Sequence, residues 1–180
     1  VVAGTIFRLM FGEVDGSLMN SMRALFGLEP IKWLKAKETG FVALILLACW
    51  RWTGVNMIYY LSGLKNISPD LYESAEIDGA SGWQRFLYIT VPLLKPTIIF
   101  VLTISIYGGL AMFTESYMLW AGNNSPKNIG LTIVGYLYRM GFERNRMGYA
   151  SAVGLVLLAI TMTINVIQLR ITGVLGKERD

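Results

Sequence analysis

Residues 68–96 read SPDLYESAEIDGASGWQRFLYITVPLLKP, an acidic segment with helix signals that lies between two long apolar runs. Ser68 followed by Pro69 is a favoured pair for an N-cap and the first residue of a helix. The short helix that they start is expected to end near Asp78-Gly79, because glycine permits a sharp change of direction there. The segment therefore predicts a short amphipathic helix at its amino end.

A second short helix is expected after the glycine. Ser81 can cap it, and Pro92 is expected to stop it, since proline lacks an N–H donor. Two helices joined at a glycine form a compact projection between the flanking apolar runs. Interfacial helices that lie on lipid prefer Lys and Arg on the polar face, whereas this segment carries Asp70, Glu73, Glu76 and Asp78. The acidic face favours docking on another protein, with a helix pair lying on lipid as the alternative.

The composition is that of a membrane protein. Of the 180 residues 54% are hydrophobic and only 16% charged, against about 25% charged in soluble domains. Three apolar runs reach the roughly 20 residues that a membrane crossing needs, at 41–64, 97–120 and 149–171. Residues 1–11 resemble the end of an earlier spanning helix. We expect an all-α integral membrane protein with one domain over 1–180, three full spans and the end of a fourth.

Several chemistries are excluded by residue counts. The chain has no His, which excludes histidine-based catalysis and imidazole metal sites. The single Cys49 cannot form an internal disulfide. The net charge of +4 comes from scattered Lys and Arg, which fits loops beside anionic lipid better than nucleic acid. We expect no catalytic residues, no metal site, no cofactor and no nucleic-acid partner.

The acidic segment resembles the EAA loop of the permeases of ABC importers. The matching positions are Glu73-Ser74-Ala75, Asp78-Gly79-Ala80, Phe86, Ile89, Pro92 and Pro96. Only Ser74 departs, where the family has Ala. The flanks resemble the carbohydrate-uptake branch, the maltose-transporter-like permeases, through Trp50-Arg51, Asn56-Met57, Tyr138-Arg139 and 148–152. Gly54-Val55 stands where that branch often has Pro-Phe. The resemblance covers the C-terminal part of such a permease, so we expect an N-terminally truncated piece of one.

The resemblance implies that residues 68–91 are coupling helices that insert into a cytoplasmic ATPase dimer. It assigns this role to Glu73, Ser74, Ala75, Asp78, Gly79, Ala80, Phe86 and Pro92. Lys and Arg occur at similar density on both sides of the membrane and do not orient the chain, but the resemblance places 65–96 and the C-terminus in the cytoplasm of a bacterial or archaeal cell. It also implies a second, related permease subunit and an extracytoplasmic solute-binding protein. ATP would bind to the partner ATPases, because this chain has no phosphate-binding loop motif.

Polar and aromatic residues within the apolar runs are candidates for the solute path. Charged side chains are costly inside a membrane, so those found in spanning segments usually serve a function. The candidates are Arg51, Trp52, Asn56, Tyr107, Thr114 and Glu115. The alternative is that Arg51 and Glu115 pair with a partner subunit or reach the membrane surface, with Trp52 as an interfacial anchor.

The expected solute is a sugar or oligosaccharide. Two other functions stay open from the sequence. One is an ABC permease for glycerol phosphate, a polyamine or phosphate, and the other is a membrane scaffold or enzyme whose loop merely resembles the motif.

Overall fold

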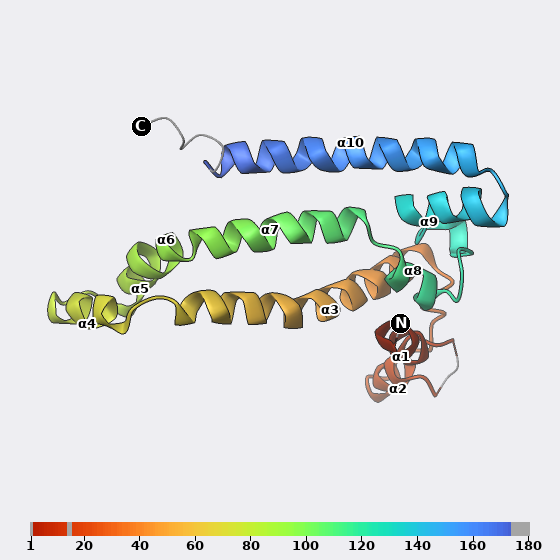
Figure 1. The fold of residues 1–180 in the computed structure, drawn as a ribbon. Helices are drawn as coiled ribbons and strands as arrows, with labels where there is room; N and C mark the ends of the chain where they lie inside the picture. Colours follow the sequence, from red (N-terminus) through yellow and green to blue (C-terminus); the bar gives the residue numbers. More distant parts are fainter. Residues whose placement is uncertain (1, 14–15, 174–180) are drawn as a thin grey trace. The chain divides into compact units, whose positions relative to one another are not determined.

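The computed structural model describes residues 2–13 and 16–173, and these residues form helices and loops without a strand (Figure 1). The elements in chain order are α1 (Val2–Met10), α2 (Leu18–Leu25), α3 (Lys37–Lys65), α4 (Pro69–Ile77), α5 (Gly82–Arg85), the π-helix η1 (Phe86–Thr90), α6 (Val91–Leu93), α7 (Lys95–Leu110), α8 (Thr114–Leu119), the 3₁₀ turn η2 (Pro126–Asn128), α9 (Ile133–Tyr138), the π-helix η3 (Arg139–Glu143) and α10 (Met147–Ile171). The all-α expectation is confirmed for this part of the chain. The C-terminal tail, expected in the cytoplasm, lies outside the described residues from 174 onward.

The chain divides into two compact units. The first comprises residues 1–51 and 108–162, and the second comprises 52–107 and 163–180. The long helices α3 and α10 each contribute one part to each unit.

The first unit has an apolar core around the start of α3. Its buried side chains are Phe7, Phe11, Leu34, Ala43, Leu44, Leu47 and Leu119. Helix α1 lies close against α8, because a Cβ on Gly4 would come within 2.5 Å of Cβ of Met118. The Trp120 indole N–H donates to the carbonyl of Leu34 over 2.9 Å. These contacts fix α1, α8 and the start of α3 as one packed group.

The second unit packs the end of α3 against α7. The ring of Tyr59 meets Phe100 edge to face, with centroids 5.2 Å apart. A Cβ on Gly63 would lie 2.5 Å from Oγ1 of Thr97, so the two helices approach closely there. Since later residues of α3 meet earlier residues of α7, the two helices run antiparallel. Thr103 also donates to Oε1 of Gln168 over 3.0 Å, which joins α7 to the end of α10.

Two of the described helices, α3 and α10, are long and apolar enough to cross a membrane. They contain the expected spans 41–64 and 149–171. Most of α10 is unburied, with Leu155 67% exposed, as suits a helix facing lipid or other subunits. Residues 82–93 and α7 would form a third span only together, across a bend of 63°.

The expectation of one continuous helix over 97–120 is wrong. Helix α7 ends at Leu110, and α8 begins only at Thr114 after Phe113 leaves helical geometry at φ −142°. Gly108 and Gly109 precede the break, and each costs a helix about 1 kcal/mol relative to alanine. Glu115 lies in the first turn of α8, where the helix dipole favours a negative charge. Hydropathy averaged over the apolar run 97–120 does not show the glycine pair 108–109 or Glu115 as signs of a helix break.

Candidate functional site

Helix α4 begins and ends as the sequence predicts. Ser68 is extended and Pro69 is the first helical residue. At the other end Gly79 has φ +80°, a left-handed conformation that favours glycine. The Gly79 N–H donates to the carbonyl of Glu76 over 3.0 Å, and the Ala80 N–H donates to the carbonyl of Ala75 over 2.9 Å. This pair of bonds is the Schellman motif, and it fixes the direction in which the chain leaves α4.

The second short helix also starts where expected. The Gln84 backbone N–H donates to the Ser81 hydroxyl over 3.3 Å, and the Ser81 N–H donates to the Gln84 side chain over 2.8 Å. These reciprocal bonds form a capping box. The box was visible in the sequence as Ser-Gly-Trp-Gln.

Pro92 does not stop this helix, which is a correction to the sequence prediction. The helical path continues through η1 and α6 to Leu93. In η1 the Val91 N–H donates to the carbonyl of Phe86, five residues back. This wider turn accommodates Pro92, which has no N–H to donate and whose ring would clash in a regular α-helix.

Three side-chain contacts tie the segment together, and none of them was predicted from the sequence. Arg85 forms an ion pair with Glu76 at 2.8 Å. The hydroxyls of Tyr72 and Thr90 lie 2.9 Å apart in a hydrogen bond, and Thr90 is buried. The rings of Trp83 and Phe86 stack with centroids 5.5 Å apart. Helix α4 is therefore held against the helices that follow it.

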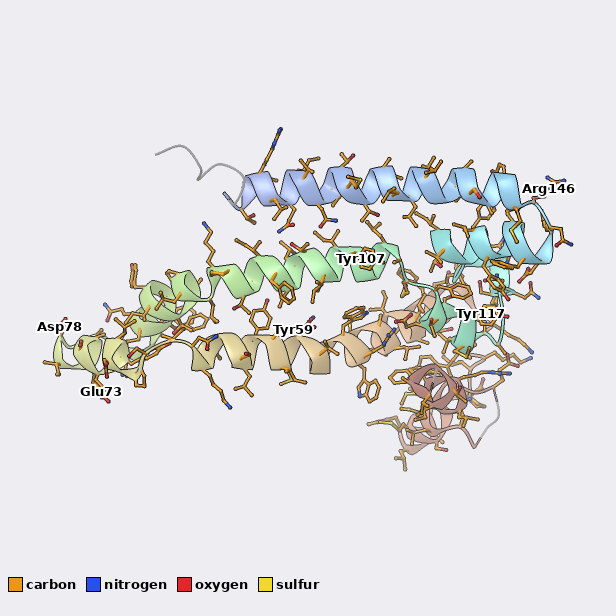
Figure 2. All side chains as sticks on the ribbon, in the orientation of Figure 1. Tyr59, Glu73, Asp78, Tyr107, Tyr117 and Arg146 are labelled. Atoms are coloured by element: carbon orange, nitrogen blue, oxygen red, sulfur yellow. The ribbon has the colours of Figure 1, made fainter. Side chains whose placement is uncertain are left out.

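The remaining surface of α4 is exposed. Glu73, Ser74 and Asp78 are exposed, and Ile77 is 87% exposed beside them. Figure 2 shows Glu73 on α4 and Asp78 at the C-terminal end of this helix. The Glu73 carboxylate forms no hydrogen bond or ion pair within the described ranges. The exposed surface thus offers an unpaired acid next to a large apolar side chain.

Arg51 and Glu115 form an ion pair within the first unit. Glu115 is 6% exposed, while the Arg51 side chain is 48% exposed. The two charges therefore pair with each other. The sequence had left open whether they line a path together or pair with a partner subunit. Thr114 lies beside Glu115 at the start of α8 and is half-buried.

The other three path candidates belong to the second unit. One face of α3 carries Trp52, Asn56, Tyr59 and Gly63 at successive spacings of 4, 3 and 4, and Tyr59 and Gly63 contact α7. Continuing this antiparallel register along the two helices, we expect Asn56 at the level of Thr103 and Trp52 at the level of Tyr107. Tyr107, labelled on α7 in Figure 2, is 62% exposed, and Trp52 is half-buried. The Asn56 side-chain oxygen is buried without a hydrogen-bond partner among the described residues. Trp52 and Asn56 therefore share one face of α3, and Tyr107 lies on α7.

Residues 2–177 match the family described as the inner membrane component of binding-protein-dependent transport systems. The chain belongs to this family. Among curated relatives, it is 52% identical over 173 residues to the arabinooligosaccharides transport system permease protein AraP of Bacillus subtilis, and the match covers 96% of this chain and 55% of AraP. It is 37% identical to the lactose transport system permease protein LacF of Rhizobium radiobacter, over 93% of this chain and 57% of LacF.

A solved structure shares the fold. A bacterial alginate ABC transporter, solved in complex with an alginate pentasaccharide-bound periplasmic protein, matches with a TM-score of 0.84 and 26% identity, over 98% of this chain and 60% of the other. The chain thus spans a little over half the length of the permeases it resembles. The resemblance to ABC-importer permeases, drawn from the EAA loop, and to their carbohydrate-uptake branch, drawn from the flanks of that loop, is confirmed.

Proposed function

We propose that this chain forms part of the permease subunit of an ATP-driven sugar importer, in which residues 68–91 dock on a cytoplasmic ATPase. The observation that carries the proposal is the exposed surface of α4, where the unpaired Glu73 lies beside Ile77. An acid can pair with a cation of the ATPase while the apolar side chain fills a pocket. The ion pair of Glu76 with Arg85 and the hydrogen bond of Tyr72 with Thr90 hold α4 against the helices that follow it. A displacement of α4 is therefore transmitted to α7.

Each residue of the segment has a role in this proposal. Glu73 makes the charged contact, and Gly79 makes the bend. The small residues Ser74, Ala75 and Ala80 let the helix approach the ATPase closely, and Asp78 ends α4. Phe86 begins the π-helix η1 and Pro92 lies in α6 directly after it. These two elements join the segment to α7. The permease changes state because it binds the ATPase differently when ATP closes the ATPase dimer.

The proposed assembly contains more than this chain. It has a cytoplasmic ATPase dimer that binds the ATP, so this subunit itself is non-catalytic. A second, related permease subunit completes the path, and an extracytoplasmic solute-binding protein delivers the solute. The alginate transporter, which was solved with a periplasmic protein, supports the last partner by analogy. Residues 65–96 and the C-terminus then lie on the cytoplasmic side of the inner membrane.

The proposed solute is a sugar or oligosaccharide. The rings of Trp52 and Tyr107 can stack on the apolar faces of sugar rings, and the Asn56 amide oxygen can accept a hydrogen bond from a hydroxyl. Within the first unit, Arg51 is paired with Glu115, and its half-exposed guanidinium and the hydroxyl of the neighbouring Thr114 on α8 are separate candidates for donating hydrogen bonds to a sugar. The sugar names of AraP and LacF support this solute class.

The docking role is tested with Glu73→Lys and Gly79→Pro in the full-length permease, co-expressed with its ATPase. We expect both variants to insert in the membrane, to lose ATPase co-purification and to lose transport. Glu29→Lys is the matched control, since Glu29 is exposed on the connection 12–40 and its charge change is the same. Unchanged ATPase association in both variants would contradict the docking role.

The solute class is tested by ATPase stimulation in the reconstituted transporter with its binding protein. Arabino-oligosaccharides, lactose, glycerol phosphate, spermidine and phosphate are compared one at a time. We expect stimulation by at least one sugar and by none of the other compounds. Stimulation by a non-sugar alone would replace the sugar with that solute class and leave the docking role intact.

A further inference from the structure

An open apolar groove runs along the first unit where α9 meets the start of α10. It has a volume of about 280 Å³ and is lined by Ile133 from α9 and by Tyr149, Ala152, Val153, Val156 and Ile160 from α10. The lining has almost no polar surface. Since α10 is long and apolar enough to cross a membrane, a groove along it suits hydrocarbon better than water.

Two arginines stand immediately before this span on a fixed turn. Arg144 and Arg146 flank Asn145, which has φ +53°. The Arg144 N–H donates to the carbonyl of Arg139 over 3.0 Å, and the Arg146 N–H donates to the carbonyl of Met140 over 2.8 Å. Both arginines are exposed, and Figure 2 shows Arg146 where α10 begins. The turn therefore holds two cations at the boundary between the span and its preceding loop.

Neither guanidinium has a counter-ion in the part of the chain that the structure describes. The adjacent acid, Glu143, accepts a hydrogen bond from the Asn123 side chain over 3.1 Å. Two unpaired arginines next to an apolar groove attract an anion that carries a hydrocarbon tail. Guanidinium groups suit phosphate because they donate two parallel hydrogen bonds to it.

Tyr136 and Tyr149 connect the arginines to the groove. Their hydroxyls lie 3.4 Å apart, and their rings meet edge to face. The hydrogen bond to Tyr149 raises the pKa of Tyr136, and the positive charges of Arg144 and Arg146 oppose this rise. Tyrosines of this kind sit at the headgroup level of membranes, with the ring toward hydrocarbon and the hydroxyl toward water.

We propose that this site binds one anionic phospholipid, with its phosphate on Arg144 and Arg146 and an acyl chain in the groove along α10. The hydroxyls of Tyr136 and Tyr149 would lie at the level of the lipid's glycerol backbone, between the phosphate and the acyl chain. The lipid would secure α9 against α10, where Leu137 already contacts Gly154. This inference rests on the membrane span and on the groove, and it does not depend on which solute the transporter carries.

The site is tested by native mass spectrometry of the full-length permease in its purified complex. The complex is titrated with phosphatidylglycerol and with phosphatidylcholine of the same acyl chains. We expect preferential retention of phosphatidylglycerol, and about tenfold or more weaker retention in Arg144→Gln/Arg146→Gln. The matched control is Lys32→Gln/Lys127→Gln, which removes two exposed cations elsewhere in the first unit and should retain the lipid.

A second pair of variants tests the groove. Ala152→Phe fills it and should weaken phosphatidylglycerol retention as much as the arginine variant does. Ser151→Phe adds similar bulk on another face of α10 and should leave retention unchanged. Equal retention of both lipids, or equal loss in the lysine control, would overturn the proposal. Displacement of the lipid by millimolar inorganic phosphate would overturn the acyl-chain contribution, and crosslinking of the groove to another protein subunit would replace the lipid with that subunit.

Discussion

Arg51 on α3 and Glu115 on α8 form an ion pair whose two members differ sharply in exposure. The Glu115 side chain is 6% exposed, whereas the Arg51 side chain is 48% exposed. The carboxylate therefore depends on the guanidinium for the interaction that water would otherwise supply. The guanidinium can still be hydrated when its partner is lost.

This asymmetry predicts unequal effects of the two single substitutions. Arg51→Met leaves a buried carboxylate unpaired and should destabilise the permease by about 3 kcal/mol. Glu115→Gln leaves only a half-exposed cation and should cost clearly less. Thermal unfolding of the full-length permease in detergent measures both. The double variant should recover part of the loss of Arg51→Met, and equal unfolding midpoints for the two single variants would contradict the asymmetry.

The sequence identified both charges but not their pairing. They stand 64 positions apart, and the spans predicted at 41–64 and 97–120 placed no particular residue of one against the other. The pairing depends on the break at 111–113, which starts a new helix at Thr114 and turns Glu115 inward. A hydropathy window averages over such a break, whereas Gly108 and Gly109 and the acid after them could have signalled it.

The close approach of α3 to α7 depends on Gly63. A Cβ there would lie 2.5 Å from Oγ1 of Thr97 and 2.9 Å from Cδ2 of Leu94. Gly63→Ala should therefore destabilise the permease by about 1–3 kcal/mol. Gly54→Ala is the control on the same helix, since no heavy atom lies within 4 Å of its Cβ position, and it should be neutral or stabilising by up to about 1 kcal/mol. The same thermal unfolding measurement ranks them, and a Gly63→Ala variant as stable as Gly54→Ala would refute the contact.

The hydroxyl pair Tyr72 and Thr90 should hold α4 against η1. Tyr72→Phe removes the bond and should weaken the segment by about 1 kcal/mol, seen as faster amide hydrogen exchange over residues 69–93. Adding Thr90→Val should cause little further change in exchange if the two hydroxyls act on each other. Tyr88→Phe is the control, because Tyr88 is 77% exposed. Equal exchange in Tyr72→Phe and the control would show that the bond does not hold the segment.

The two ends of α4 and the start of α5 were predictable because each depends on a local signal. Ser68-Pro69, Gly79 and Ser81 act through their own backbone and a neighbour three or four residues away. The bond between Tyr72 and Thr90 depends instead on the π-turn at 86–90, which changes the direction of every later side chain. The prediction that Pro92 ends the helix is wrong for the same reason. A proline interrupts a regular α-helix, but here Pro92 follows the π-turn at 86–90 and the helical path continues to Leu93.

The aromatic pair Trp52 and Tyr107 should affect transport through the ring faces. Trp52→Ala and Tyr107→Ala are each expected to raise the KM for the stimulating sugar about tenfold, since a lost stacking contact costs roughly 1 kcal/mol or more. Tyr107→Phe keeps the ring and should retain most of the activity. Because Tyr107 is 62% exposed, its alanine variant should unfold at the wild-type temperature, so a change in KM reports on the solute rather than on folding. Leu102→Ala, another exposed change on α7, is the control. An unchanged KM in Tyr107→Ala, or the same increase in Leu102→Ala, would remove this face of α7 from the solute path.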